Sequence, residues 1–195
     1  MTPFDYAVGL ITILVGLALA DVCVSLHKLL RQGRSVRWDG RVILSVAFVI
    51  TVITGMWFSV WSIRTLGVVL RYPFYLTLFL EFMMLFLVCA ACLPDDATEN
   101  RDLKVFYDGN RRYLWGLFAL FQTSFLLHWI YFSVDARRPG PMHRWSLLVA
   151  GAMVFVPAIV FLLLAFIGAR RFHYAALVAL LIFYLYRYWG ATLAV

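Results

Sequence analysis

Long apolar runs, separated by short polar segments, make up most of the chain. A run of about 20 mainly apolar residues is long enough to cross a bilayer as an α-helix. The pattern predicts six such spans, at residues 5–30, 42–63, 73–93, 113–134, 145–168 and 172–190. Because the connections are short, we expect the 195 residues to form a single domain, an integral membrane protein of the all-α class.

The connection at residues 94–112 is the only sizeable polar segment. Asp96 and Glu99 have the spacing of a capping box, and apolar residues then recur at helical intervals up to Gly109-Asn110. This predicts a short amphipathic helix at residues 97–108 on the membrane surface, with an ordinary polar connector as the alternative. The charged residues that would dock a partner or meet the membrane interface are Asp96, Asp102, Lys104, Arg111 and Arg112.

The same segment resembles a pattern in small, uncharacterised inner-membrane proteins of bacteria. The residues that carry the resemblance are Leu93-Pro94-Asp95-Asp96, Asp102-Leu103, Phe106-Tyr107, Arg111-Arg112 and Gly116-Leu117. The resemblance implies a location in the bacterial inner membrane. It implies no activity.

A shift of 100 residues aligns parts of the two halves of the chain. The informative pairs are Gly16 with Gly116, Arg71 with Arg171, and Phe74 with Tyr174. If the match is a true repeat rather than chance similarity, residues 1–95 and 113–195 are halves of three spans each. An odd number of spans inverts the second half, which is the 3+3 plan of many transporters. Gly55 and Pro157 interrupt matching spans and would mark a pair of broken helices.

The composition excludes an ordinary soluble domain, since 64% of the residues are hydrophobic, 14% are charged and the mean hydropathy is +0.88. Lys and Arg are more frequent in the first, third and fifth connections, which the positive-inside rule places in the cytoplasm. These cations are Lys28, Arg31, Arg34, Arg37, Arg41, Arg101, Lys104, Arg111, Arg112, Arg170 and Arg171. Both termini are then expected outside. The net charge of +7 suits anionic lipid headgroups and requires no nucleic acid.

The tryptophans agree with this arrangement, because Trp side chains favour the two membrane–water interfaces. Trp38 and Trp115 are expected at the inner interface. The tryptophans expected at the outer interface are Trp61, Trp129, Trp145 and Trp189.

Four ionisable residues fall within the predicted spans, where an unpaired charge is costly. They are Asp21, His27, Glu81 and His128. At 1.5 Å per residue, Glu81 lies about 12 Å and His128 about 9 Å from the same outer face. The two side chains are therefore predicted to hydrogen-bond, with Arg64 and Arg187 somewhat further out. Such a cluster would form a proton, ion or solute pathway, or a structural bond that locks two helices together.

Asp21 lies in the other, inner half of the membrane. It shares one helical stripe with Ser25 and Lys28. We expect it either to join a charge cluster that fixes helix ends at the inner face or to act as a second station of the pathway.

The cysteines and two histidines near the inner face form a candidate metal site. Cys89 and Cys92 make a C-x-x-C pattern, and Cys23 and His27 are four residues apart. With His173 they would bind a soft metal, and haem between His27 and His173 is an alternative. In a reducing cytoplasm such cysteines are most often small apolar residues, so no cofactor is expected.

The chain contains no Walker, G-x-G-x-x-G, H-E-x-x-H or G-x-S-x-G motif and no potassium-channel filter, so enzymatic activity is not expected. The first hypothesis is a small transporter or a proton- or ion-permeable protein. The second is an interaction or sensor subunit that assembles with a membrane complex or with further copies of itself. The third is a redox protein that binds haem or metal.

Overall fold

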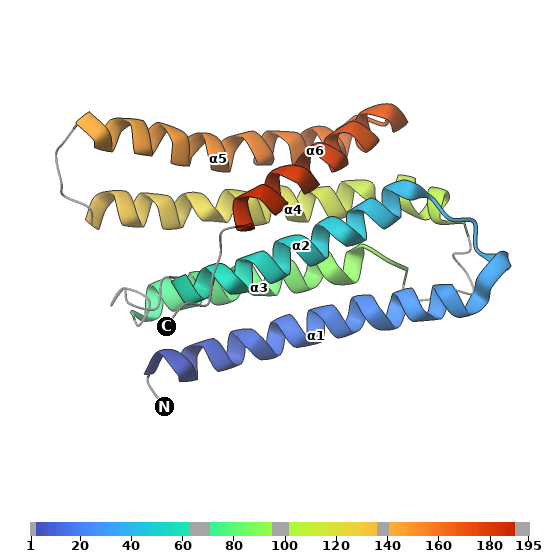
Figure 1. The fold of residues 1–195 in the computed structure, drawn as a ribbon, viewed down its shortest axis with the longest axis horizontal. Helices are drawn as coiled ribbons and strands as arrows, with labels where there is room; N and C mark the ends of the chain where they lie inside the picture. The colour runs from blue at the N-terminus through green and yellow to red at the C-terminus, as the bar shows by residue number, and fades with distance from the viewer. Residues whose placement is uncertain (1–2, 63–70, 95–101, 136–140, 190–195) are drawn as a thin grey trace.

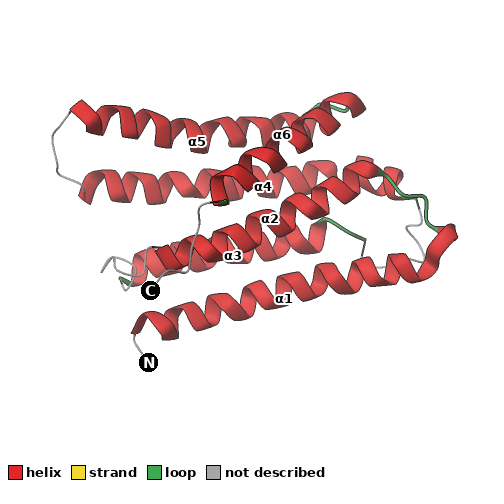
Figure 2. Ribbon diagram, in the orientation of Figure 1, coloured by secondary structure: helices red, strands yellow, loops and turns green. Residues whose placement is uncertain are grey.

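The computed structural model describes residues 3–62, 71–94, 102–135 and 141–189, with the side chains of 3–7, 62, 126–135 and 141–150 left out. These residues form six α-helices and one short 3₁₀ helix, with no β-strand among them (Figures 1 and 2). The elements are α1 (Pro3–Gln32), η1 (Gly33–Ser35), α2 (Gly40–Ser62), α3 (Tyr72–Ala91), α4 (Leu103–Asp135), α5 (Pro141–Phe166) and α6 (Arg170–Tyr188). The all-α prediction is confirmed, and each α-helix overlaps one predicted span.

The helices run along the long axis of the molecule in alternating directions, and α6 crosses in front of the others at an angle (Figure 1). Helices α1, α3 and α5 end, and α2, α4 and α6 begin, at the right-hand end of this view. We call it the basic end, because many described cations belong to it. They are Lys28, Arg31, Arg34, Arg37, Arg41, Lys104, Arg111, Arg112, Arg170 and Arg171. The first, third and fifth connections therefore lie at one end of the bundle.

Three of the described helices are long and apolar enough to cross a membrane, over Val8–Ser35, Gly40–Trp61 and Tyr72–Ala91. A shorter apolar helix covers Gly151–Phe166. Large apolar side chains on these helices face outward, as Ile13 does on α1. Lipid covers such a surface without the cost that water would impose. The three helices indicate a membrane protein, while membrane crossing by α4, α5 and α6 and the orientation of the termini stay predictions.

The start of α4 differs from the prediction for the third connection. The pattern predicts a surface helix at residues 97–108 that ends at Gly109-Asn110, whereas α4 continues through both residues. Asn110 lies within α4, and its side-chain amide donates to the carbonyl oxygen of Ala91 at the end of α3. The helix begins after Asp102, whose Oδ1 accepts hydrogen bonds from the N–H groups two and three residues later. The predicted end was wrong because this segment packs against the bundle.

The two halves of the chain pack differently. Helix α1 lies mainly against α3, whereas α4 lies mainly against α5, and α2 lies mainly against α6. The inverted repeat therefore stays a prediction. Helices α2 and α5 are continuous at Gly55 and Pro157, so neither is broken there. Gly55 serves instead as a crossing point, since a Cβ at this position would collide with the ring of Tyr188 on α6.

Five buried aromatic side chains from α2, α4, α5 and α6 form what we call the aromatic layer, namely Phe48, Trp115, Phe118, Phe161 and Tyr184. The rings of Trp115 and Phe161 stack with centroids 6.0 Å apart, and Phe118 stacks on Phe161 at 5.1 Å. Trp115 is fully buried among these rings, so it does not anchor the bundle through contact with lipid headgroups, and its depth relative to the membrane stays a prediction. Its apolar area is covered by other rings rather than by lipid.

Candidate functional site

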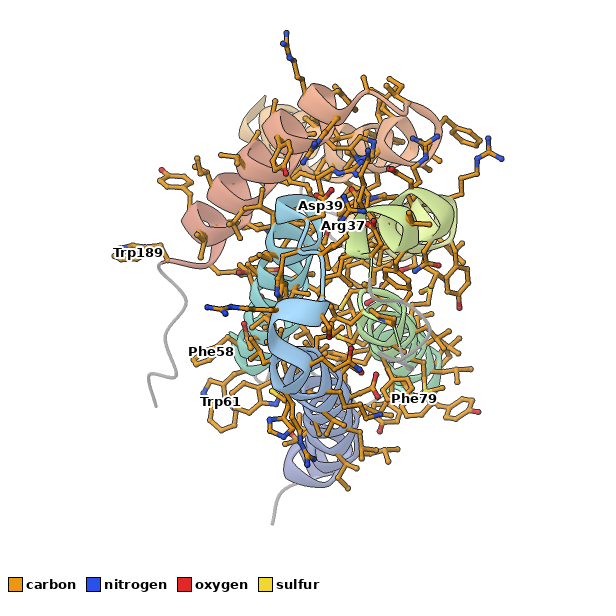
Figure 3. All side chains as sticks on the ribbon, turned by 90° about the vertical axis from the view of Figure 1, so that its right-hand side faces the viewer. Arg37, Asp39, Phe58, Trp61, Phe79 and Trp189 are labelled. Carbon is orange, nitrogen blue, oxygen red and sulfur yellow. The ribbon has the colours of Figure 1, made fainter. Side chains whose placement is uncertain are left out.

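A buried ion pair lies where α2 begins; Figure 3 looks onto this end of the bundle and labels Asp39. Asp39 is the N-cap of α2, because its Oδ1 accepts a hydrogen bond of 2.8 Å from the backbone N–H of Arg41. The Arg41 side chain turns back to the same carboxylate, with Nε 3.2 Å from Oδ1 and Nη2 3.0 Å from Oδ2. Only 1% of Arg41 is exposed. A guanidinium buried to this degree requires such partners.

Asp108 on α4 is the second acidic partner of Arg41. The guanidinium donates from Nη1 to Asp108 Oδ1 at 2.7 Å, across 67 residues of sequence. It also lies over the ring of Tyr107, 4.6 Å from the centroid. From α6, Nη2 of Arg170 lies 3.8 Å from Asp39 Oδ2. We call these five residues the Arg41 cluster, and they join the first turns of α2 and α6 to the second turn of α4.

The cations of the cluster set the protonation of Asp39. Burial by itself raises the pKa of the Asp39 carboxyl. Hydrogen bonds from Arg41 and the positive charges of Arg41 and Arg170 outweigh burial, and the pKa lies below its ordinary value. Asp39 is therefore a carboxylate at neutral pH. This state suits permanent pairing and not the uptake and release of protons near pH 7.

A chain of hydrogen bonds continues from Tyr107 to α6. The Tyr107 hydroxyl accepts a hydrogen bond from Trp115 Nε1 at 3.0 Å and lies 2.8 Å from Nδ1 of His173. Nε2 of His173 lies 2.7 Å from the carbonyl oxygen of Ile167, which can only accept. These roles assign the Nε2–H tautomer to His173, so that Tyr107 donates to Nδ1. The imidazole is neutral in this arrangement, and protein groups bind both of its nitrogens.

Two further polar contacts lie deeper in the bundle. Tyr184 donates to Gln122 Oε1 at 2.8 Å, and Gln122 Nε2 donates to the carbonyl oxygen of Met153 at 3.3 Å. These bonds connect α6, α4 and α5. Ser124 Oγ on α4 donates to Glu81 Oε1 on α3 at 3.0 Å, and Glu81 is 0% exposed. Both contacts are therefore hydrogen bonds between helices at the buried side chains of Gln122 and Glu81, where a satisfied hydrogen bond is strong.

The aromatic layer separates these deeper contacts from the Arg41 cluster. Along α4, Trp115 and Phe118 lie between Asp108 and Gln122. The distance along the helix from Asp108 to Gln122 is about 21 Å at 1.5 Å per residue. Aromatic rings of this kind do not relay protons. The Tyr184–Gln122 and Ser124–Glu81 bonds thus lie well apart from the Arg41 cluster along the bundle.

The residues predicted for a pathway are only partly described. Arg64 and the side chain of His128 lie outside the described parts of the chain. Ser124 is one helical turn before His128 on α4, so the contact of Ser124 with Glu81 brings the predicted pair of spans together. The Glu81–His128 bond itself stays a prediction. Arg187 is exposed, with its guanidinium 5.9 Å from the ring centroid of Tyr184.

The predicted metal ligands differ in their exposure to the surface. Cys89 and Cys92 are buried, whereas Cys23 and His27 are exposed on α1. His173 is fully buried in the hydrogen-bonded chain described above. Among the residues that the structure describes, no group of three or more His, Cys, Asp or Glu side chains could hold a metal ion.

Asp21, predicted for the inner half of the membrane, is half-buried on α1. Its place in a proton pathway stays a prediction.

The charged residues predicted for docking have different roles. Asp102 pairs with Arg37 at 3.0 Å and caps α4, so it ties the first connection to the third. Lys104 and Arg112 are exposed, whereas Arg111 is half-buried. The remaining residue, Asp96, lies outside the described residues.

The sequence pattern places Arg41 among the loop cations and Tyr107 on a surface helix, and so it misses the Arg41 cluster. Part of the cluster could have been found in the sequence. Asp39-Gly40-Arg41 stands directly before an apolar run, and an acid at a helix N-cap two residues before an arginine predicts a local ion pair. Sequence spacing gives no reason to add Asp108, because that contact depends on how α4 packs against α2.

Comparison of the chain with protein-family models, with curated proteins and with solved structures gave no match in any of the three. We therefore base the function on the residues of this chain alone.

Proposed function

We propose that the protein is a non-catalytic membrane scaffold that presents its basic end to an acidic partner protein. The observation that carries this proposal is the Arg41 cluster, in which the buried Arg41 guanidinium joins the start of α2 to α4, and Asp39 adds the start of α6 through Arg170. In a bacterial inner membrane with both termini outside, this end would face the cytoplasm.

The Arg41 cluster supports a scaffold because a buried ion pair can fix how two helices pack against each other. Removing two charges from water largely cancels their attraction, so such a pair adds little net stability. The best-attested use of a buried polar pair is to fix one register between packed elements. Here the pair fixes the start of α4 against the start of α2. A surface held in this way loses little conformational entropy when a partner binds.

The first turns of α4 offer a surface for the partner. Val105 and Tyr113 are 68% and 54% exposed, and Lys104 and Arg112 are exposed next to them. We call these four residues the docking face. At about 100° per residue, Arg112 lies about 20° from Val105 around α4, while Lys104 and Tyr113 lie about 80° to either side of this pair. The closest match of a cation with an apolar side chain is therefore Arg112 beside Val105. Apolar anchors beside cations fit an acidic protein surface.

Site-specific photo-crosslinking in native membranes tests the proposal. A photo-reactive side chain at Val105 is expected to capture a second protein, and the same group at Ile13 on the outer surface of α1 is not. The double variant Lys104→Glu/Arg112→Glu should lower capture about tenfold or more, since both charges would then repel an acidic partner. The matched control is Arg187→Glu, a charge reversal at the opposite end of the bundle, which should leave capture unchanged. Capture that is insensitive to the docking-face charges contradicts the proposal.

Proton or ion permeation is the second candidate, and Glu81 is the observation that favours it. A carboxyl group in the middle of an apolar helix is often functional, and Ser124 brings it within a turn of His128. Permeation would need a state in which water reaches Glu81. Purified protein in liposomes should then carry a pH- or voltage-dependent flux that Glu81→Gln lowers. Such a flux would favour permeation over the scaffold, and a flux equal to that of empty liposomes would remove it.

A further inference from the structure

Helices α5 and α6 diverge from their shared turn (Figure 1). An apolar groove lies between them. The groove has a volume of about 650 Å³, within the range of about 300–1,000 Å³ that ligand pockets occupy. Its lining is almost wholly apolar and includes Val156, Val160 and Leu163 on α5 and Phe172, Ala179 and Phe183 on α6. The small side chains on α6 keep the groove open toward the outside of the bundle.

The length of the groove matches one leaflet of a bilayer. Its lining on α6 extends from Phe172 to Phe183, which is about 16 Å at 1.5 Å per residue. The hydrocarbon core of a bilayer is about 30 Å thick, so each leaflet contributes about 15 Å. A single acyl chain lying along α6 would therefore fill the groove from end to end. A helix from another protein would extend through both leaflets and use only half of its length there.

Cations lie at the basic end of the groove. Arg111 on α4 packs against the turn between α5 and α6, where a Cβ on Gly168 would come 2.7 Å from its Nη1. Arg171 is exposed and lies four residues before Ala175, so it begins the stripe that Ala175 and Ala179 continue into the groove. The first N–H groups of α6 point the same way, and its N-cap Ala169 has no side-chain oxygen to satisfy them.

We propose that this groove binds an anionic phospholipid of the bilayer, with one acyl chain between α5 and α6 and the phosphate at Arg111 and Arg171. The apolar lining and the leaflet-length fit select a hydrocarbon chain. The cations at one end select a negatively charged headgroup over a zwitterionic one. This site is separate from the docking face and does not depend on the proposed scaffold role.

Native mass spectrometry of the detergent-solubilised protein tests the site. Phosphatidylglycerol and phosphatidylcholine with identical acyl chains are titrated in parallel. The wild-type chain should retain phosphatidylglycerol about tenfold more tightly. The double variant Arg111→Gln/Arg171→Gln should reduce that preference to about onefold to threefold. The control Arg34→Gln neutralises an exposed cation elsewhere at the basic end, and it should leave the preference for phosphatidylglycerol unchanged.

A second pair of variants tests the acyl chain. Ala179→Phe places a ring in the groove and should lower retention of both lipids, whereas Val178→Phe adds the same ring to the neighbouring exposed position and should not. Thermal unfolding shows whether either variant has lost its fold, and the arginine variants test the site independently of this result. Equal retention of the two lipids by the wild type overturns the proposal. Dimeric masses that Ala179→Phe abolishes would also overturn it, because a second copy would then occupy the groove.

Discussion

Arg41 donates to Asp108 at 2.7 Å from inside the bundle, while Asp108 keeps 42% of its side chain exposed. The two partners therefore differ in what their removal leaves behind. Loss of Arg41 leaves Asp39 as a buried carboxylate that keeps only its longer, exposed pair with Arg170 at 3.8 Å, whereas loss of Asp108 leaves Arg41 still paired with Asp39.

Arg41→Met should lower the free energy of unfolding by about 3–5 kcal/mol, the cost of removing one partner of a buried ion pair. Asp108→Asn should cost about 1 kcal/mol or less, because its pair is open to solvent. Unfolding titrations in mixed detergent micelles measure both values. Equal losses in the two variants would show that Asp39 and Asp108 share the cation evenly.

Stability should fall in acid through Asp39. The pKa of this carboxyl is lower in the folded protein than in the unfolded chain, so its contribution is complete above the unfolded value of about 4. It is then lost as the pH falls through the folded pKa. We expect the free energy of unfolding to drop between pH 4 and lower values in the wild type, with a shallower drop in Asp39→Asn. Asp102→Asn, at a more exposed pair, serves as the control. Identical pH profiles for Asp39→Asn and the wild type would argue against this assignment.

Tyr107→Phe should destabilise the bundle by about 2–4 kcal/mol, because it leaves Trp115 Nε1–H and His173 Nδ1 buried without their partner. Tyr113→Phe removes the same hydroxyl from an exposed ring and should change stability by less than about 0.5 kcal/mol. Thermal unfolding of the two variants side by side gives the comparison. A Tyr107→Phe protein as stable as Tyr113→Phe would mean that the hydroxyl is not needed by either neighbour.

Gly55→Ala should destabilise the protein by about 1–3 kcal/mol, since the added methyl group overlaps the ring of Tyr188. The same change at Gly16, where nothing lies within 4 Å of the new Cβ, should be neutral or slightly stabilising. In a Tyr188→Ala background, Gly55→Ala should no longer lower the free energy of unfolding, because the ring that its methyl group would meet is absent. A penalty that persists in the double variant would place the strain in α2 itself and not at its crossing with α6.

The helices could be predicted from the sequence because a long apolar run has few other stable forms in a membrane. Depth counting along the third and fourth spans also brings Glu81 close to α4, where it contacts Ser124. What could not be predicted depends on which faces meet. Trp115 is a tryptophan near the end of a predicted span, which is typical of a residue at the membrane interface. Its place in the core depends on the packing of Phe118 and Phe161 against it.

The Arg41 cluster shows the same limit. The spacing of Asp39 and Arg41 is local and visible in the sequence, but Asp108 is brought in by the contact of α4 with α2. Gly55 is similar, because a glycine in an apolar run predicts a break as readily as a close crossing. In each case the missing information is the rotation of a helix about its own axis.

The order of synthesis gives the double pairing of Arg41 a further meaning. Asp39 leaves the ribosome just before Arg41, whereas Asp108 follows 67 residues later. At about 5–20 residues per second, that interval is about 3–13 s. During this time α2 and α3 are synthesised, and Asp39, two residues from Arg41, is the acidic partner already present in the chain. Asp108 is made later, with the start of α4, so the local partner of Arg41 is available in the chain before the distant one.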